Sequence, residues 1–218
     1  MTPGRRLPTL LDAHRDALAA CRRCGHADHR VLPIISEARR PRAMLVGQAP
    51  GKSEVEDRRA FAGRAGRTLF RWLERAGLDE PTFRREVYIA AVTRCYPGPS
   101  PAGRGDRVPS LEEQAHCAPW LDAELDLIRP ALIIPVGRLA IDRFLEPEPL
   151  DRLVGRMHHA RVRGRRVTLI PLPHPSGASS WVNMPANRAL LERALHHLRD
   201  AFIELGVGPS RAAARQSA

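Results

Sequence analysis

The sequence predicts an α/β protein, a three-layer α/β/α sandwich around a central four-stranded parallel sheet. Strand-like segments alternate with helical segments along the chain, and several of the strand-like segments are continuously apolar, as strands buried on both faces are. The 218 residues, 43% of them apolar, suit one domain. We expect that domain to span residues 1–205 and a polar, disordered tail to follow at 206–218.

The expected elements alternate in order along the chain. Apolar residues at helical spacing indicate each helix, and Ser110 with Glu113 forms a capping box at the start of one of them. Helices are expected at residues 10–21, 67–76, 111–128 and 187–205, with another beginning at Gly137. Strands are expected at residues 43–46, 87–92, 131–136 and 167–170.

Four cysteines suggest a metal centre. Cys21 and Cys24 form a C-R-R-C turn, Cys95 follows the second expected strand, and Cys117 lies in the helix after it. Four thiolates match either a Cys₄ iron–sulfur cluster or a structural zinc. Zinc ribbons usually pair two C-x-x-C turns, so the split second pair favours a cluster. Two disulfides or unrelated buried thiols are the alternatives, and a reducing cytosol argues against disulfides.

The charge of the chain favours a polyanionic partner. Thirty-five basic against 24 acidic residues give a net charge of +11, and Lys52 is the only lysine. Nucleic acid is the leading candidate partner, and an arginine-rich composition with nothing bound is the alternative. No apolar run approaches the ~20 residues of a membrane span and no signal core is present, so we expect a cytoplasmic protein with no membrane partner.

Two loops follow strands at the edge where ligands of such folds bind. Gly47-Gln-Ala-Pro-Gly51 is a sharp turn whose N–H groups can face a pocket, or a purely structural turn. His174-Pro-Ser-Gly177 holds a histidine rigidly between two prolines, where it can donate to a substrate oxygen or serve as a loop residue. Ser176 and Gly177 can offer donors to a phosphate.

In combination these segments resemble the uracil-DNA glycosylase superfamily, and most closely its iron–sulfur-containing bacterial and archaeal families, the fourth and fifth. The resemblance covers roughly residues 18–200. Its parts, in order, are C-R-R-C, L-V-G-Q-A-P-G at 45–51, A-F-A-G-R-A-G at 60–66, V-Y-I at 87–89 followed by Cys95, Cys117, V-G at 136–137 with Ala140, and H-P-S-G at 174–177.

The resemblance implies a cytoplasmic bacterial DNA-repair enzyme that flips uracil out of single- or double-stranded DNA, acting as a monomer. It implies a structural [4Fe–4S] cluster on the four cysteines. His174 would donate to the departing uracil, amides near Gln48 and Ala49 beside Gly47 would assist, and Phe61 would stack on the base or simply pack in the core.

The sequence departs from the family at two positions. The acid that many relatives carry in the first motif is replaced by Gln48 and Ala49, and the asparagine that some relatives carry after the second strand by Ala91. Substitutes are Glu54, Glu56 and Asp57 for the acid, with Asp57 favoured as the catalytic residue, and Asn183 for the amide. Each acid has the alternative of a solvated helix-face charge.

The remaining expectations concern DNA. Trp181 or Val182 would fill the gap left by the flipped base or pack under the last helix. Arg64, Arg67 and Arg104 are candidate phosphate contacts. Because the acid is missing, a catalytically silent iron–sulfur DNA-binding protein on the same fold is the main alternative function, and an iron–sulfur redox sensor is a third.

Overall fold

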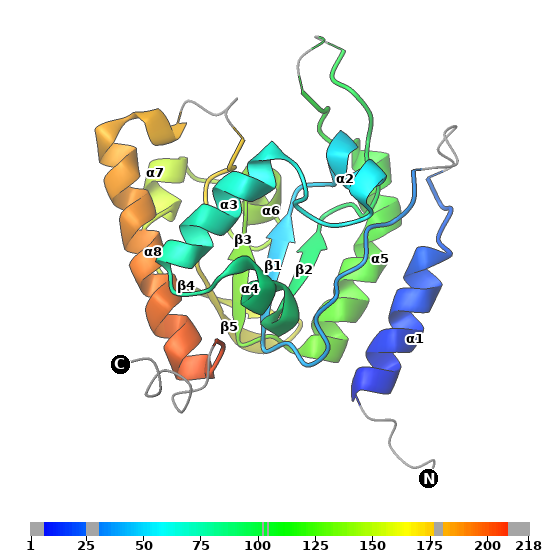
Figure 1. Ribbon diagram of the computed structural model, residues 1–218, viewed down its shortest axis with the longest axis horizontal. Coiled ribbons are helices and arrows are strands. Elements are labelled where there is room, and N and C mark those ends of the chain that lie inside the picture. Colours follow the sequence, from blue (N-terminus) through cyan, green and yellow to red (C-terminus); the bar gives the residue numbers. More distant parts are fainter. Residues whose placement is uncertain (1–6, 25–30, 102, 104, 177–180, 209–218) are drawn as a thin grey trace.

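The computed structural model describes residues 7–24, 31–101, 103, 105–176 and 181–208. Within these ranges the strands form one sheet in the order β2-β1-β3-β5-β4 (Figure 1). Its parallel part consists of β1 (Ala43–Gly47), β2 (Val87–Ala91), β3 (Leu132–Pro135) and β5 (Arg165–Leu169). β4 (His158–Val162) lies at the edge and pairs antiparallel with β5.

Helices cover both faces of this sheet. They are α1 (Leu7–Ala19), α2 (Lys52–Asp57), α3 (Arg64–Arg75), α4 (Glu80–Glu86), α5 (Leu111–Ile128), α6 (Arg138–Asp142), α7 (Leu150–Leu153) and α8 (Pro185–Leu205), with a 3₁₀ turn η1 (Trp181–Asn183) before α8. Within the described ranges, none of them is both long and apolar enough to cross a membrane.

The core divides into two apolar layers, one on each face of the sheet. Alternate residues of β1, such as Leu45 and Met44, point to opposite faces. Leu45 belongs to a cluster with α3, α4 and α8, and Met44 to a cluster with α1, α5 and α6. The predicted three-layer sandwich is therefore confirmed.

The predicted four-stranded parallel sheet is incomplete, because the sheet has a fifth, antiparallel strand. β4 has the polar sequence H-H-A-R-V and is only half-buried at alternate positions, since it lies at the edge. A two-residue turn joins it to β5, and Arg163 and Gly164 both have positive φ there, 49° and 76°. That is the geometry of a tight hairpin turn, for which glycine at the second position is the available sequence signal.

The ends of the elements agree closely with the expected ranges. Ser110 caps α5 as predicted: its hydroxyl accepts from the Glu113 N–H over 3.1 Å, and the Glu113 carboxylate accepts from the Ser110 N–H over 2.7 Å. Packing continues past α8 to Val207, which is buried in the α3/α8 cluster. Residues 209–218 of the expected tail lie outside the described ranges.

Candidate functional site

The carboxyl ends of the parallel strands bring the two motif loops to one edge. Gly47 ends β1 opposite Ala91 of β2, and its carbonyl accepts from the Val92 N–H over 2.9 Å. On the other side of β1, the Gly137 N–H donates to the Leu172 carbonyl over 3.0 Å. The first-motif turn, the end of β2 and the chain leading to His174 therefore lie along the same edge, as the sequence predicts.

A narrow cavity of about 30 Å³ lies at this edge, which is room for one or two waters. The first-motif turn, the end of β2 and the Phe61 segment form its walls. Its lining residues are Ile34, Gly47, Ala49, Pro50, Glu54, Ala60, Phe61, Ile89, Ala90, Ala91 and Arg94. The structure thus brings three of the predicted substrate-binding residues, Gly47, Ala49 and Phe61, to one cavity.

The Phe61 ring is held against the first-motif turn by two glycines. A Cβ at Gly47 would lie 3.1 Å from Cζ of Phe61, so the ring packs directly on the backbone there. Phe61 itself has a φ of 54°, an unusual conformation for an aromatic residue. A Cβ at Gly66 would lie 1.7 Å from the Phe61 carbonyl oxygen, so only glycine permits this turn.

His174 is fixed in orientation and in tautomer. The Ser176 backbone N–H lies 3.2 Å from Nδ1 and donates to it, and the Ser176 hydroxyl lies 2.8 Å from the same nitrogen. Because Nδ1 accepts, the neutral ring carries its proton on Nε2. Burial lowers the pKa of His174, which keeps the ring neutral near pH 7. Cδ2 of the ring also sits 3.0 Å from where a Cβ on Gly137 would lie, so glycine leaves room for it.

The structure separates the three candidate acids. Glu54 is half-buried and lines the narrow cavity, and its carboxylate accepts from the Gly51 N–H over 2.9 Å. Burial, the largest cause, raises its pKa, and the nearby Asp106 carboxylate adds to the effect. Asp57 is exposed at the end of α2, and Glu56 is exposed one residue earlier. The position of Asp57 therefore does not support the catalytic role expected for it.

The first-motif side chains offer no acid of their own. Gln48 is half-buried, and its carbonyl accepts from the Thr93 N–H over 3.2 Å, which ties the turn to the end of β2. Its side-chain amide has no hydrogen-bond partner within the described ranges. Asp106, which sequence reasoning did not single out, approaches the same turn: Oδ2 lies 2.8 Å from where a Cβ on Gly51 would be.

The second-motif residues divide between two places. Ser176, Val182 and Asn183 line a separate cavity of about 720 Å³ beside α3, together with Arg64. Asn183 therefore does not line the narrow cavity where an amide was expected. Trp181 is half-buried against the α3/α8 core, and its carbonyl accepts from Nδ2 of Asn187 over 2.9 Å.

Two expected contacts cannot be placed. Gly177 and Arg104 lie outside the described residues.

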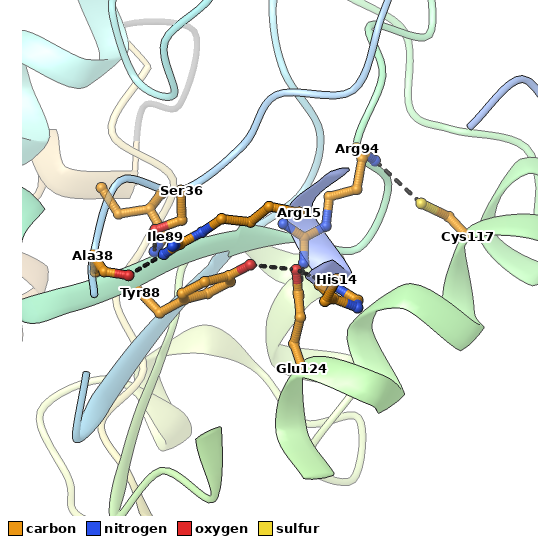
Figure 2. A network of polar contacts seen from close by, with 9 residues as sticks. All are labelled: His14, Arg15, Ser36, Ala38, Tyr88, Ile89, Arg94, Cys117 and Glu124. Carbon is orange, nitrogen blue, oxygen red and sulfur yellow. Dashed lines mark hydrogen bonds and ion pairs between the residues drawn. The ribbon is translucent and has the colours of Figure 1, made fainter. Parts of the chain in front are cut away.

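All four cysteines line one cavity of about 210 Å³ between the end of α1, the end of β2 and α5. All four are free thiols, so the structure does not contain the disulfides considered as an alternative. The Arg94 backbone N–H donates to Sγ of Cys117 over 3.2 Å (Figure 2). The C-R-R-C turn and Cys95 and Cys117 thus come together from distant parts of the chain.

Four cysteines around one cavity are the donor set of a Cys₄ iron–sulfur cluster or a structural zinc. Among the described residues, no three His, Cys, Asp or Glu side chains lie close enough together to hold a metal ion. Burial, and then the charges of Cys117, Cys24 and Cys21, raise the pKa of Cys95 to about 12. A nearby cation would favour the thiolate form of this cysteine.

Two buried donors of the cavity wall have no hydrogen-bond partner in the part of the chain that the structure describes. They are the Thr93 hydroxyl and the Trp120 indole N–H, both shielded from solvent. The guanidinium of Arg23, within the C-R-R-C turn, lies over the Trp120 ring at 5.1 Å from its centroid. Buried donors without partners are costly, and an acceptor held in the cavity would satisfy these two. Sequence reasoning missed both residues.

A buried ionic network joins this cavity to the core (Figure 2). The Arg94 guanidinium pairs with the Glu124 carboxylate, and both side chains are nearly inaccessible. The same carboxylate accepts from the Tyr88 hydroxyl over 2.7 Å and lies 3.3 Å from Nε2 of His14. Burial, followed by the charges of Arg94 and Arg15, lowers the pKa of His14. α1, β2 and α5 are therefore linked directly behind the cysteines.

Comparison with known proteins gives a consistent family. The model of the uracil DNA glycosylase superfamily matches residues 35–199. The type-4 uracil-DNA glycosylase of Sulfurisphaera tokodaii is 27% identical over 209 residues, which cover 92% of this chain and 87% of that protein. A type-4 uracil-DNA glycosylase of Pyrobaculum aerophilum is 30% identical over 173 residues, 77% of this chain and 82% of that protein. A type-5 enzyme of the same organism is 29% identical over 177 residues, 76% and 73% of the two chains.

Proposed function

The chain belongs to the uracil-DNA glycosylase superfamily, and from that premise we propose that it hydrolyses the N-glycosidic bond of uracil in DNA. The product is an abasic site, which makes the reaction the first step of base excision repair. One observation carries the proposal: His174 is held as a neutral Nε2–H donor at the strand edge where Phe61 and the first-motif turn form a cavity. A protein that only bound DNA would have no need of so constrained a donor.

The proposed chemistry depends on stabilising a leaving anion. As the bond between the sugar and the base breaks, negative charge moves onto the uracil ring and its oxygens. Nε2–H of His174 donates to one of these oxygens, and this hydrogen bond strengthens only as the charge develops. A fixed donor of this kind is worth about 3–4 kcal/mol of barrier. Phe61 stacks on the flipped base, and the backbone N–H groups of Gln48 and Ala49 add further donors.

Water must then attack the sugar carbon, and we assign its positioning to Glu54 with the Gln48 amide. Glu54 lines the cavity, and burial raises its pKa, which makes its carboxylate a better proton acceptor than an exposed one. The water gives its hydroxyl to the sugar and its proton to the carboxylate, and the uracil anion later takes up a proton. Asp57 is too exposed and too far along α2 for this role.

Cys21, Cys24, Cys95 and Cys117 would hold a [4Fe–4S] cluster in the 210 Å³ cavity. When bound, the cluster would supply a structural cross-link between the C-R-R-C turn, the end of β2 and α5. The Thr93 hydroxyl and the Trp120 N–H would donate to its sulfur atoms, which accounts for their lack of protein partners. The hydrolysis itself requires no change of oxidation state.

The proposal is tested by incubating the purified protein with oligonucleotides that contain one uracil, single-stranded and paired, and measuring abasic sites. Oligonucleotides with thymine in place of uracil are the control. Uracil-dependent strand breakage after alkali supports the proposal, and its disappearance in His174→Ala links it to this site. Tight binding of the uracil DNA with no base release would instead identify a catalytically silent DNA-binding protein.

A further inference from the structure

The cavity of about 720 Å³ beside α3 is a groove that the proposed chemistry does not use. One wall is the exposed side of α3 with the start of α4, and the other comes from the second-motif segment and η1. Its lining residues are Arg64, Arg67, Thr68, Phe70, Arg71, Trp72, Glu74, Asp79, Glu80, Pro81, Pro175, Ser176, Val182 and Asn183.

Three arginines form a row along this groove. Arg64, Arg67 and Arg71 are spaced by three and four residues, so they share one face of α3, and all three are exposed. No carboxylate in the described part of the chain lies within ion-pair distance of any of them. The next residue of the row, Arg75, differs: it pairs with Glu192 of α8 and does not line the groove. The row therefore presents three cations without counter-ions.

The opposite end of the groove is acidic, and most of that charge is already engaged. The Asp79 carboxylate accepts from the Thr82 N–H over 2.7 Å, and Glu80 pairs with Arg84 at 2.8 Å. Glu74, near the end of α3, is the remaining acid. An anionic ligand is thus favoured at the Arg64 end and excluded from the far end. Figure 1 shows that the Arg64 end of α3 lies toward the edge where the parallel strands finish.

Two chain segments connect the groove to the proposed base site, although the two cavities share no lining residue. Arg64 follows Phe61 by three residues, and Ser176 follows His174 by two. Ser176 contributes to both places, because it holds Nδ1 of His174 and also lines the groove. A strand whose base reached Phe61 would therefore pass its backbone along this row.

We propose that the groove binds the phosphodiester backbone of the strand that carries the target base, on one side of that base. Arg64, Arg67 and Arg71 contact successive phosphates, and Ser176 and Asn183 provide neutral polar contacts. From Arg64 to Arg71 the helix rises about 10 Å, whereas three successive phosphates of one strand span about 7 Å along the axis, a difference of about 3 Å that long arginine side chains can bridge. This inference rests on the proposed function for the identity of the strand.

The test is the salt dependence of binding to an oligonucleotide without uracil, measured by fluorescence anisotropy. The triple variant Arg64→Gln, Arg67→Gln, Arg71→Gln removes three phosphate contacts, so the slope of log K against log salt should fall by about 2–3. Arg75→Gln is the matched control on the same helix and should leave the slope unchanged. Replacement of all three by lysine keeps the charge and should restore most of the slope.

A second measurement locates the contacts. Neutral methylphosphonate linkages are placed one at a time on either side of a uracil analogue that resists hydrolysis. The groove is supported if methylphosphonates at about three consecutive positions on one side weaken binding of the unaltered protein. The same substitutions should not weaken binding of the triple variant. An unchanged salt slope in the triple variant, or an equal loss in Arg75→Gln, overturns the inference. The inference is also overturned if the triple variant loses the salt slope for RNA but keeps it for DNA of the same length.

The outcomes separate this inference from the proposed function. Failure of the wild-type protein to release uracil contradicts the proposed function, and the salt slope on uracil-free DNA still reports on the groove. Uracil release together with an unchanged slope in the triple variant contradicts the groove alone.

Discussion

The backbone N–H of Ser176 donates to Nδ1 of His174 over 3.2 Å, and this contact settles which ring nitrogen can act on a substrate. A backbone donor cannot be rotated away as a hydroxyl can, so Nδ1 remains an acceptor as long as the loop keeps its shape. The neutral ring therefore keeps its proton on Nε2. The loop thus holds His174 in the tautomer that donates through Nε2 before DNA binds, which is the preorganisation that anion stabilisation requires.

His174→Ala should slow single-turnover uracil release by roughly 10²–10³-fold, the cost typical of one oxyanion donor. The affinity for uracil DNA should change little, because the lost hydrogen bond strengthens only as charge develops. Rates are measured with enzyme in excess, and affinity with a non-hydrolysable uracil analogue. Ser176→Ala, which keeps the backbone N–H, should cost much less. A near-wild-type rate for His174→Ala would remove this residue from the mechanism.

The rate of uracil release should fall as the pH drops below the folded-state pKa of His174. Burial places that pKa below its ordinary value of 6.5, so the active neutral ring persists through pH 6.5. Protonation of Nδ1 would then turn the acceptor of the Ser176 N–H into a competing donor. Stability follows the same direction: the unfolded chain binds the proton first, so stability declines between pH 6.5 and the folded pKa. Single-turnover rates and urea unfolding across this interval measure both effects, and a rate that rose with acidity would contradict the neutral-donor mechanism.

Glu54→Gln should reduce single-turnover uracil release by roughly 10²–10⁴-fold, the range typical of general acid–base catalysis. The glutamine side-chain oxygen can still accept from the Gly51 N–H, so the turn should keep its shape. Asp57→Asn is the matched control, an acid of the same short helix that is exposed, and it should have no effect. If instead Asp57→Asn were the damaging change, the assignment of Glu54 would be wrong.

Anaerobically purified protein should be brown and contain about four irons per chain, as a [4Fe–4S] cluster requires. Cys95→Ser removes one ligand and should lower both iron content and thermal stability. His116→Ala is the control, because His116 lines the same cavity but is exposed. Iron and acid-labile sulfide analysis measures the content. Colourless protein with one zinc per chain would show that the cavity holds a different centre.

Glu124→Gln should destabilise the fold by about 3–5 kcal/mol, the cost of leaving one partner of a buried ion pair uncompensated. The glutamine can still accept from the Tyr88 hydroxyl, so the loss reports mainly on the unpaired Arg94 charge. Asp126→Asn on the same helix disrupts an exposed pair with Arg163 and should change stability only slightly. Urea unfolding of cluster-loaded protein provides the comparison. Equal effects of the two variants would mean that the network does not stabilise the fold.

The apolar strands and the capped helix could be predicted because their signals are local. β1 is buried throughout, and its five residues are apolar or glycine; the α5 cap needs only Ser110 and Glu113. β4 carried no such signal, since an edge strand buries little, and only Gly164 in its turn pointed to it. Helix α4 was also missed, although Asp79 caps it by accepting from the Thr82 N–H.

The site was predictable as a set of motifs but not as a set of contacts. The sequence predicted that the four cysteines share one site and that His174 lies at the strand edge. It could not separate Glu54 from Asp57, because the direction of a side chain on a six-residue helix depends on how that helix packs. Nor could it find the pairing of Arg94 with Glu124, since these residues are thirty positions apart in the sequence and a long loop lies between them.

The contact between Gly66 and the Phe61 carbonyl bears on how this enzyme could be redesigned to accept other bases. Any side chain at position 66 would push the Phe61 turn outward and carry the aromatic ring with it. A library meant to reshape the pocket should therefore keep this glycine and vary the small residues that line the same cavity, Ala49, Ala60 and Ala91. Library variants that carry a substitution at position 66 would lose the aromatic side of the pocket and could not report on base selectivity.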